Sequence, residues 1–141
     1  MSWVVDTCVL IDILVNDPTF GRSSALCLKR NLSKGLVICP VSMIELSPAF
    51  GGDIQRQKKF LQLCGVHCDH SFSDVDIVCA HKVWNHYIAK KRLHDVPRRP
   101  VADIMIGAFS SRFDGLITRN QNDFNPWFPK LKLIVPGHSK S

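Results

Sequence analysis

The chain has 141 residues and a formal net charge of +6, and 45% of its residues are hydrophobic. This length suits one domain with one core, and the hydrophobic content argues against a disordered chain. The longest uncharged run, Gly35 to Ile44, is far shorter than the roughly 18 residues of a membrane-spanning helix, so we expect no membrane association, and the basic charge favours polyanionic partners.

Short apolar runs with the character of strands alternate with segments of helical spacing along the chain. The predicted strands are Trp3–Val5, Leu36–Cys39, Val66–His70, Leu116–Thr118 and Leu131–Val135. The predicted helices are Val9–Val15, a helix opened by Asp17 and Pro18 and stopped by Gly35, Ser42–Ser47, Ile54–Cys64, Ser73–Leu93 and Val101–Arg112. This alternation predicts a single three-layer α/β/α domain over residues 1–136, with a mostly parallel sheet of four or five strands and a flexible tail at 137–141.

The N-terminus and the cysteines bear on the compartment. No basic region precedes the first apolar run, and Asp6 interrupts that run, so the sequence does not read as a signal peptide. The six cysteines lie mostly in apolar surroundings of a chain long enough to form a core, which favours free thiols over disulfides. We therefore expect a soluble cytoplasmic protein.

Most of the twelve acidic residues have an ordinary structural interpretation. Asp17 and Asp53 fit helix N-caps, and Asp76 fits a capping box with Ser73. Asp12, on a short helix, is expected to face solvent. Predicted turns or helix starts account for four others, namely Asp69, Asp74, Asp95 and Asp114.

Four acids in apolar settings remain: Asp6, Glu45, Asp103 and Asp123. Each also has a structural alternative. Asp6 could cap the first helix, and Glu45 could complete a capping box with Ser42. Asp103 could interact with the dipole of its helix, and Asp123 could be an ordinary loop residue.

The four acids share a place relative to the predicted strands. Asp6 ends the first strand, and Glu45 follows the second within one helical turn. Asp103 lies in the first turn of the helix before the Leu116–Thr118 strand, and Asp123 follows that strand. In an open parallel sheet, ligands bind at the carboxyl ends of the strands. Carboxylates gathered there repel one another unless a cation neutralises them, and hard oxygen ligands select Mg²⁺ or Mn²⁺.

Four motifs in this order resemble the PIN-domain family, especially its VapC-type toxins. They are Val4-Val-Asp6-Thr7, Val41-Ser-Met-Ile-Glu45-Leu46, Ala102-Asp103-Ile-Met-Ile-Gly-Ala108 and Leu116-Ile-Thr118-Arg119-Asn120-Gln-Asn-Asp123-Phe124. Their order and rough spacing agree with the family over almost the whole chain. The first motif alone would be common after any strand, whereas the four together on an α/β pattern are fairly specific.

The resemblance implies a PIN-like fold and Mg²⁺- or Mn²⁺-dependent hydrolysis of RNA. Asp6, Glu45, Asp103 and Asp123 match the family's acidic positions and would bind the metal and carry catalysis. Beside them we expect substrate contacts from four residues, Thr7, Thr118, Arg119 and Asn120. The resemblance also implies a cognate antitoxin as partner, and it leaves a homodimer open.

Two segments depart from the family's pattern. Leu63–His70 is rich in Cys and His, and a zinc site there is a second hypothesis, although its spacing matches no common finger. The loop from Val96 to Pro100 is basic and bounded by prolines, where relatives often carry glycine. It bears on the choice of substrate.

A basic segment from Lys82 to Arg99 holds six Lys and Arg residues and one acid, Asp95. It fits either an RNA-binding track or a solvated helix face. Trp84 and Tyr87 could stack on bases, but their helical spacing favours core packing.

Other functional classes fit less well. A catalytically silent PIN-fold module that binds a protein is the main alternative, and a metal titration would distinguish it. A phosphoacceptor receiver domain needs adjacent acids early in the chain, which Asp6-Thr7-Cys8 lacks. An aspartyl phosphatase needs Asp-x-Asp after the first strand, and Cys8 occupies the second of those positions.

Overall fold

A computed structural model describes residues 2–94 and 100–137 of the chain. Its centre is one five-stranded sheet in the order β3-β2-β1-β4-β5, and every neighbouring pair is parallel. The strands are β1 (Trp3–Val5), β2 (Leu36–Val37), β3 (Val66–His67), β4 (Gly115–Ile117) and β5 (Leu133–Ile134). The predicted parallel sheet of four or five strands is confirmed.

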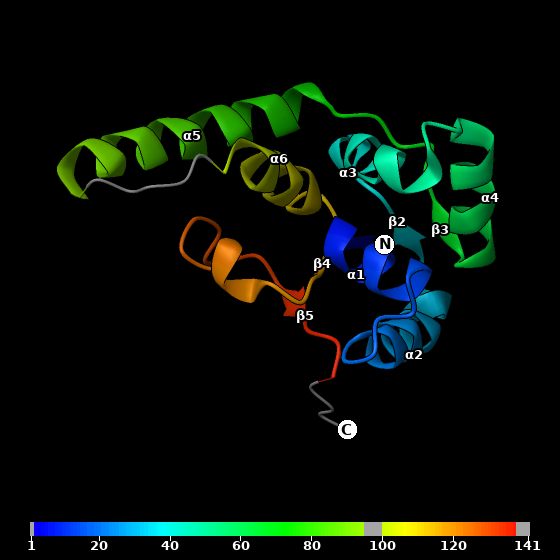
Figure 1. Ribbon diagram of the computed structural model, residues 1–141. Coiled ribbons are helices and arrows are strands. Elements are labelled where there is room, and N and C mark those ends of the chain that lie inside the picture. Colours follow the sequence, from blue (N-terminus) through cyan, green and yellow to red (C-terminus); the bar gives the residue numbers. More distant parts are fainter. Residues whose placement is uncertain (1, 95–99, 138–141) are drawn as a thin grey trace.

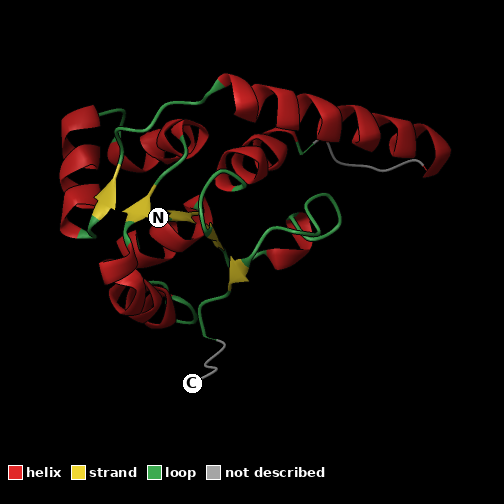
Figure 2. Cartoon of the chain, turned by 180° about the vertical axis from the view of Figure 1, so that it is seen from behind, coloured by secondary structure: helices red, strands yellow, loops and turns green. Residues whose placement is uncertain are grey.

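Helices cover both faces of this sheet, which gives the expected three layers (Figure 1). The α-helices are α1 (Thr7–Leu14), α2 (Gly21–Asn31), α3 (Pro40–Leu46), α4 (Ile54–Leu63), α5 (Asp74–His94) and α6 (Val101–Ser110). The 3-10 turns are η1 (Leu32–Lys34), η2 (Ser47–Phe50) and η3 (Gln121–Asp123). Seen from behind, α5 extends past the sheet as a long rod with α6 beneath it (Figure 2). No described helix is long and apolar enough to cross a membrane.

Alternation of side chains along the strands divides the core between the two faces. Val5 and Ile117 point into one cluster, which also holds buried residues of α1, α2 and α4. Val4 and Leu116, their neighbours in sequence, point into a second cluster with α6. These strand residues have no exposed surface, whichever face of the sheet they point to. A parallel sheet covered by helices on both faces requires such burial. The packing therefore fixes the register of the central strands and the place of each loop that follows them.

Three helix boundaries differ from the sequence prediction. α1 begins at Thr7 because Asp6 is extended, with φ −72° and ψ 153°, and its side chain caps the helix. α2 begins only at Gly21. The Asp17 carboxylate accepts from the backbone N–H groups of Thr19 and Phe20 at 3.0 and 2.8 Å, so it closes a turn before the helix rather than capping it.

The start of α3 also differs. This helix begins at Pro40, with Cys39 as its N-cap, because proline is favoured at the first helical position. Ser42 is therefore inside the first turn, and it is not the N-cap that a capping box with Glu45 requires. That structural alternative for Glu45 is wrong.

Two predicted caps are confirmed. Asp53 accepts from the backbone N–H groups of Gln55 and Arg56 at 3.1 and 3.2 Å. Ser73 and Asp76 form the reciprocal capping box, at 2.9 and 3.3 Å. Local sequence was sufficient here because each bond closes within three residues.

The cysteines and the chain ends complete the comparison with the sequence. All six cysteines are free, as predicted. Asp95, the basic loop between Val96 and Pro100, and the predicted tail beyond Gly137 lie outside the described residues.

Candidate functional site

The strand order creates one position where a ligand site is expected. β1 has β2 on one side and β4 on the other, so the connections that leave β1 and β4 diverge at the carboxyl edge of the sheet. Such a topological switch point opens a crevice beside the strand ends. Asp6 directly follows β1, and Thr118 directly follows β4. The sequence-predicted residues thus begin at the place where the topology favours binding.

The Asp6 carboxylate links the two strand ends. Its Oδ1 accepts from the backbone N–H of Thr7 at 2.8 Å, which is the N-cap bond of α1. Its Oδ2 accepts from the Thr118 hydroxyl at 2.7 Å, and the Cys8 thiol lies 3.5 Å from the same oxygen. The capping role that the sequence offered as an alternative is therefore real. The capping bond occupies Oδ1, while Oδ2 is directed toward Thr118 at the end of β4.

Burial makes this carboxylate costly to ionise. Only 5% of Asp6 is exposed, and desolvation raises its pKa above the ordinary value of 3.8. Hydrogen bonds from Thr118, Thr7 and Cys8 oppose that shift, and the negative charge of Glu45 adds to it. A cation beside Asp6 would offset both the desolvation and the repulsion. The chemistry of this carboxylate therefore fits a hard divalent metal.

Glu45 approaches the same strand end from α3. Its Oε1 accepts from the Thr7 hydroxyl at 2.6 Å, while the residue itself is exposed. α3 packs against both α1 and α6, so it carries Glu45 toward the first turn of each. Thr7 thus joins the two acids, because its backbone N–H binds Asp6 and its side chain binds Glu45.

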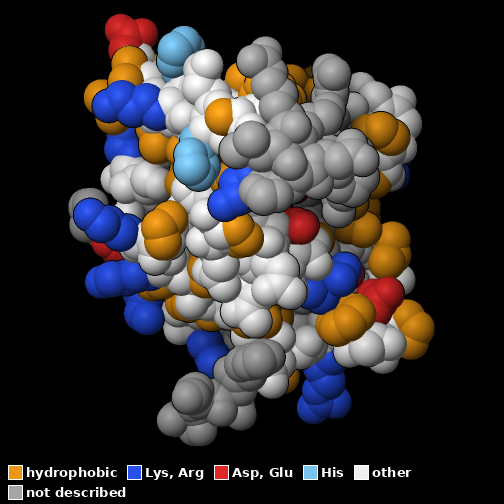
Figure 3. Space-filling view, turned by 90° about the vertical axis from the view of Figure 1, so that its left-hand side faces the viewer, with side chains coloured by type: hydrophobic (Ala, Val, Ile, Leu, Met, Phe, Trp, Pro, Cys, Tyr) orange, Lys and Arg blue, Asp and Glu red, His pale blue; other side chains and the backbone are white. Residues whose placement is uncertain are grey.

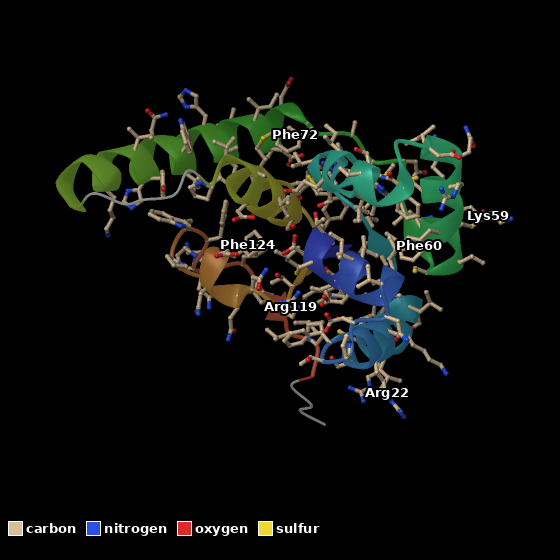
Figure 4. The ribbon with its side chains drawn as sticks, viewed as in Figure 1. Arg22, Lys59, Phe60, Phe72, Arg119 and Phe124 are labelled. Carbon is tan, nitrogen blue, oxygen red and sulfur yellow. The ribbon has the colours of Figure 1, made fainter. Side chains whose placement is uncertain are left out.

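Asp103 and Asp123 reach this edge from the other side of β1. Asp103 is half-buried in the first turn of α6, where the helix-dipole alternative also places it. Asp123 is half-buried at the end of η3. The next residue, Phe124, is buried in the same cluster as Ile106 of α6, and Figure 4 shows it beside that helix. This packing holds the two acidic segments against each other.

The loop after β4 is folded back on the strand end. The backbone N–H of Asn120 donates to the Thr118 hydroxyl oxygen at 3.0 Å, while that hydroxyl donates to Asp6. Thr118 has no exposed surface. It therefore serves as a buried link between the loop that carries Asp123 and the carboxylate that ends β1.

No ready-made metal cage accompanies this arrangement. Within residues 2–94 and 100–137, no three His, Cys, Asp or Glu side chains stand together as metal ligands. Hydrogen bonds join Asp6, Thr7, Glu45 and Thr118, and Asp103 and Asp123 lie on segments that pack against each other. The same observation gives no support to the zinc hypothesis for the Cys- and His-rich segment Leu63–His70.

Asp12 corrects the sequence interpretation. The residue was expected to face solvent, but only 3% of it is exposed. It receives two bonds from the Arg119 guanidinium, Nε to Oδ2 at 2.8 Å and Nη2 to Oδ1 at 3.0 Å, and Ser24 lies 3.4 Å from Oδ2. The guanidinium also covers the Phe20 ring at 4.2 Å, beside α1 in Figure 4. Arg119, expected among the substrate contacts, is thus engaged within the protein.

One signal in the sequence could have revealed that Asp12 is buried. α1 is apolar on nearly all of its faces, since six of its eight residues are Cys, Val, Leu or Ile. A helix that is apolar all round is buried, and a buried acid needs a partner. The identity of that partner, 107 positions away, was not readable from local spacing.

The basic helix divides into core and surface. Tyr87 is 1% exposed and belongs to a cluster with α6, and Trp84 stacks on it at 5.5 Å with an interplanar angle of 19°. Core packing is therefore confirmed for Tyr87. Lys82 and Lys90 are exposed, so this part of the helix is a solvated face that remains free to bind a polyanion.

Comparison with known proteins establishes the fold. No family model and no curated protein matches the chain. It is similar to a solved structure of VapBC2 from Rickettsia felis bound to a DNA fragment from its promoter, with a TM-score of 0.65 and 13% identity over 96% of this chain and 99% of the other. It is also similar to a toxin–antitoxin complex from Klebsiella pneumoniae, with a TM-score of 0.58 and 19% identity over 95% and 97%. These likenesses, with the all-parallel sheet, identify a PIN-like α/β/α fold.

Proposed function

We propose that this PIN-like chain is a metal-dependent endoribonuclease and the toxin of a toxin–antitoxin pair. The observation that carries the proposal is the buried Asp6 carboxylate at the switch point, bonded to Thr118 and linked through Thr7 to Glu45. Burial raises the pKa of Asp6, and acids with a raised pKa are common at functional sites. An acid with only a capping role would need neither the second strand end nor the second acid.

Asp6, Glu45, Asp103 and Asp123 are the residues we propose to hold Mg²⁺ or Mn²⁺. Such an ion, when bound, activates water and stabilises the charge that develops on a scissile phosphate. Carboxylate oxygens are the donors these ions select. Thr118 fixes the direction of Asp6 Oδ2, and Thr7 holds Glu45 at the strand end, so these two hydroxyls orient the carboxylates.

RNA is the proposed substrate, and the net charge of +6 favours a polyanion. The proposed role of Arg119 changes from a substrate contact to a positioning residue. Since Asp12 neutralises its guanidinium, we assign it to positioning the loop that carries Asn120 and Asp123. Asn120 and Thr7 remain as proposed substrate contacts, whereas Thr118, which has no exposed surface, is assigned to orienting the Asp6 carboxylate.

An antitoxin is the proposed partner, because the two similar structures are described as VapBC2 and as a toxin–antitoxin complex. Apolar side chains exposed on α5 offer a surface for a protein, with Val75 68%, Ile77 53% and Val78 54% exposed. A second copy of this chain would use such a surface equally well. Cytoplasm is the location that this proposal implies.

A catalytically silent protein-binding module is the second candidate. The lack of a three-ligand group among the described side chains favours it. The two candidates differ in one measurable respect, since a silent module gains no stability from Mn²⁺. A ligand that binds only the folded state at 100 times its Kd stabilises it by about 2.7 kcal/mol.

The test is cleavage of a defined RNA with Mn²⁺ and with EDTA, for the parent and for Asp6→Asn, Glu45→Gln, Asp103→Asn and Asp123→Asn. We expect losses beyond the roughly 10–100-fold that a supporting residue costs. Asp69→Asn is the matched control, because the Asp69 side chain is 82% exposed. Asp12→Asn does not serve as a control, since it breaks a buried pair. Equal cleavage by the parent and by Asp103→Asn, or metal-independent cleavage, would refute the proposal.

A test of the partner is separate. The product of the neighbouring gene, co-expressed with the chain, should co-purify with it and suppress cleavage. If that product neither binds nor inhibits, the toxin assignment fails while the nuclease assignment stands.

A further inference from the structure

A groove of about 850 Å³ lies at the opposite edge of the sheet from the acids. Its walls come from three parts of the chain: α5, the turn between α6 and β4, and the segment 127–132 before β5. The last two parts precede strands, so they mark the amino edge. The groove is therefore distinct from the carboxyl edge of the sheet, where Asp6 follows β1.

Charge around this groove is positive. Lys82 of α5 and Lys130 and Lys132 of the last segment line it, and all three are exposed. Asp114 is the one acid in the described lining. On the face drawn in Figure 3, Lys and Arg side chains lie along one margin, among apolar ones. Such a rim complements a polyanion.

The wall between the lysines is apolar and aromatic. Phe113 and Trp127 are half-buried, and Phe128 is buried. Trp127 is braced by an edge contact with Tyr87, with ring centroids 5.0 Å apart at 72°. A held aromatic side chain with part of its surface open is what unstacked bases pack against.

We propose that this groove binds a single-stranded segment of the RNA substrate outside the cleavage site. Lysines beside aromatic side chains fit phosphates and bases together, whereas a duplex hides its base faces. The inference rests on the proposed ribonuclease function for the identity of the ligand. It adds an anchoring site that the catalytic acids do not supply.

The distance between the two sites suits one RNA strand. α6 begins beside the acids with Asp103 and leads to Ser111, which lines the groove. Eight residues at a rise of about 1.5 Å each give a separation of roughly 12 Å along the helix. α5 packs against α6 over this length and carries Lys82 and Lys90 on its exposed side. A strand anchored in the groove needs only a few nucleotides to reach the acids.

The experiment measures binding without metal, so that cleavage does not intervene. A fluorescent single-stranded RNA of about 20 nucleotides, longer than typical sites of about 4–16 nucleotides, is titrated in EDTA at several salt concentrations. The groove variant is Lys82→Gln/Lys130→Gln/Lys132→Gln. The control variant is Lys34→Gln/Lys58→Gln/Lys59→Gln, which removes the same charge from exposed positions. Figure 4 shows Lys59 projecting from α4, across the molecule from the 125–131 segment.

Each neutralised phosphate contributes about 0.7 to the slope of log K against log salt. The groove variant should therefore lose about 2 from that slope, and the control variant much less. With Mn²⁺, the groove variant should raise the KM for the long RNA while kcat is unchanged. An RNA dinucleotide, whose single phosphodiester bond must occupy the cleavage site and leaves no strand for the groove, should be cleaved by parent and variant alike.

Several results would overturn the groove assignment. Equal slope changes in both triple variants would show that RNA binding depends on the net charge and not on the groove. An acidic peptide of matched charge that binds the groove as tightly as RNA would make it a protein-docking surface. If the groove variant binds RNA as tightly as the parent does, the groove assignment is refuted and the nuclease proposal stands. If the parent never cleaves RNA, the nuclease proposal itself fails.

Discussion

The buried pair between Asp12 and Arg119 allows a prediction with a defined order of effects. Asp12 keeps 5% of its side chain exposed and Arg119 keeps 29%. The two single substitutions are therefore unequal. Asp12→Asn leaves a cation that still reaches water, whereas Arg119→Gln leaves a buried carboxylate whose remaining side-chain partner is Ser24 at 3.4 Å.

Magnitudes follow from this difference in exposure. Breaking a fully buried pair costs about 3–5 kcal/mol, and an exposed pair contributes about 0–1 kcal/mol. We place Asp12→Asn at about 1–2 kcal/mol and Arg119→Gln at about 2–3 kcal/mol, between these limits. For a domain of this size each kcal/mol lowers Tm by roughly 4 °C, so the losses are about 4–8 °C and 8–12 °C. In the double variant neither charge remains, and it should lose less than Arg119→Gln alone.

The assay is thermal and urea unfolding of the parent, both single variants and the double variant in EDTA. The double-mutant cycle should give a coupling free energy of about 1–2 kcal/mol, within the range for residues in direct contact. Two single variants that each lie within about 0.5 kcal/mol of the parent, as ordinary surface substitutions do, would refute the burial argument. A double variant with the summed loss of both singles would refute the pairing.

Three further predictions concern the site and the core. Burial raises the pKa of Asp6, so the metal-free protein should lose stability as pH rises from about 4 through that raised value. Asp6→Asn should flatten this pH dependence in melting curves. An identical pH profile in parent and variant would contradict the prediction. Thr7→Val removes the 2.6 Å hydrogen bond to Glu45, which is worth about 0.5–1.5 kcal/mol. The kcat should therefore fall about 2- to 12-fold, with a small change in Tm. An unchanged kcat would count against Thr7 as a positioning residue. Gly107→Ala places a methyl group against the Phe128 ring and should cost about 1–3 kcal/mol in urea unfolding, where a gain in stability would show that the ring moves freely.

Much of the fold was readable from the sequence because its causes are local. The apolar run from Trp3 to Val5 ends at an acid, and Gly35, at φ 89°, stops the second helical segment. The capping box of Ser73 and Asp76 closes within one turn. Parallel pairing followed from the alternation of strands and helices, since parallel neighbours need a crossover between them. Helix boundaries were less accurate, because Asp6 and Pro40 each start a helix earlier than the apolar spacing indicated.

The site was predicted only as a set of residues near one edge. The sequence placed Asp6 and Glu45 after consecutive strands, but the link between them through Thr7 depends on α3 packing against α1. Fewer ligands converge in the structure than the four motifs suggested. Side chains on separate elements meet only when packing sets both the position and the rotation of each helix.

Tertiary structure alone decided where Asp12 and Arg119 lie. Nothing in the spacing of α1 names a residue 107 positions later as the partner of Asp12, and the pair forms because β4 lies beside β1. The lysine-lined groove has the same origin, since its walls come from three separate segments. Sequence patterns report what each residue needs, which is burial, a cap or a turn. A charge buried far from its partner along the chain is satisfied only by the three-dimensional fold, because the interaction acts over a few ångströms of space and not over sequence distance.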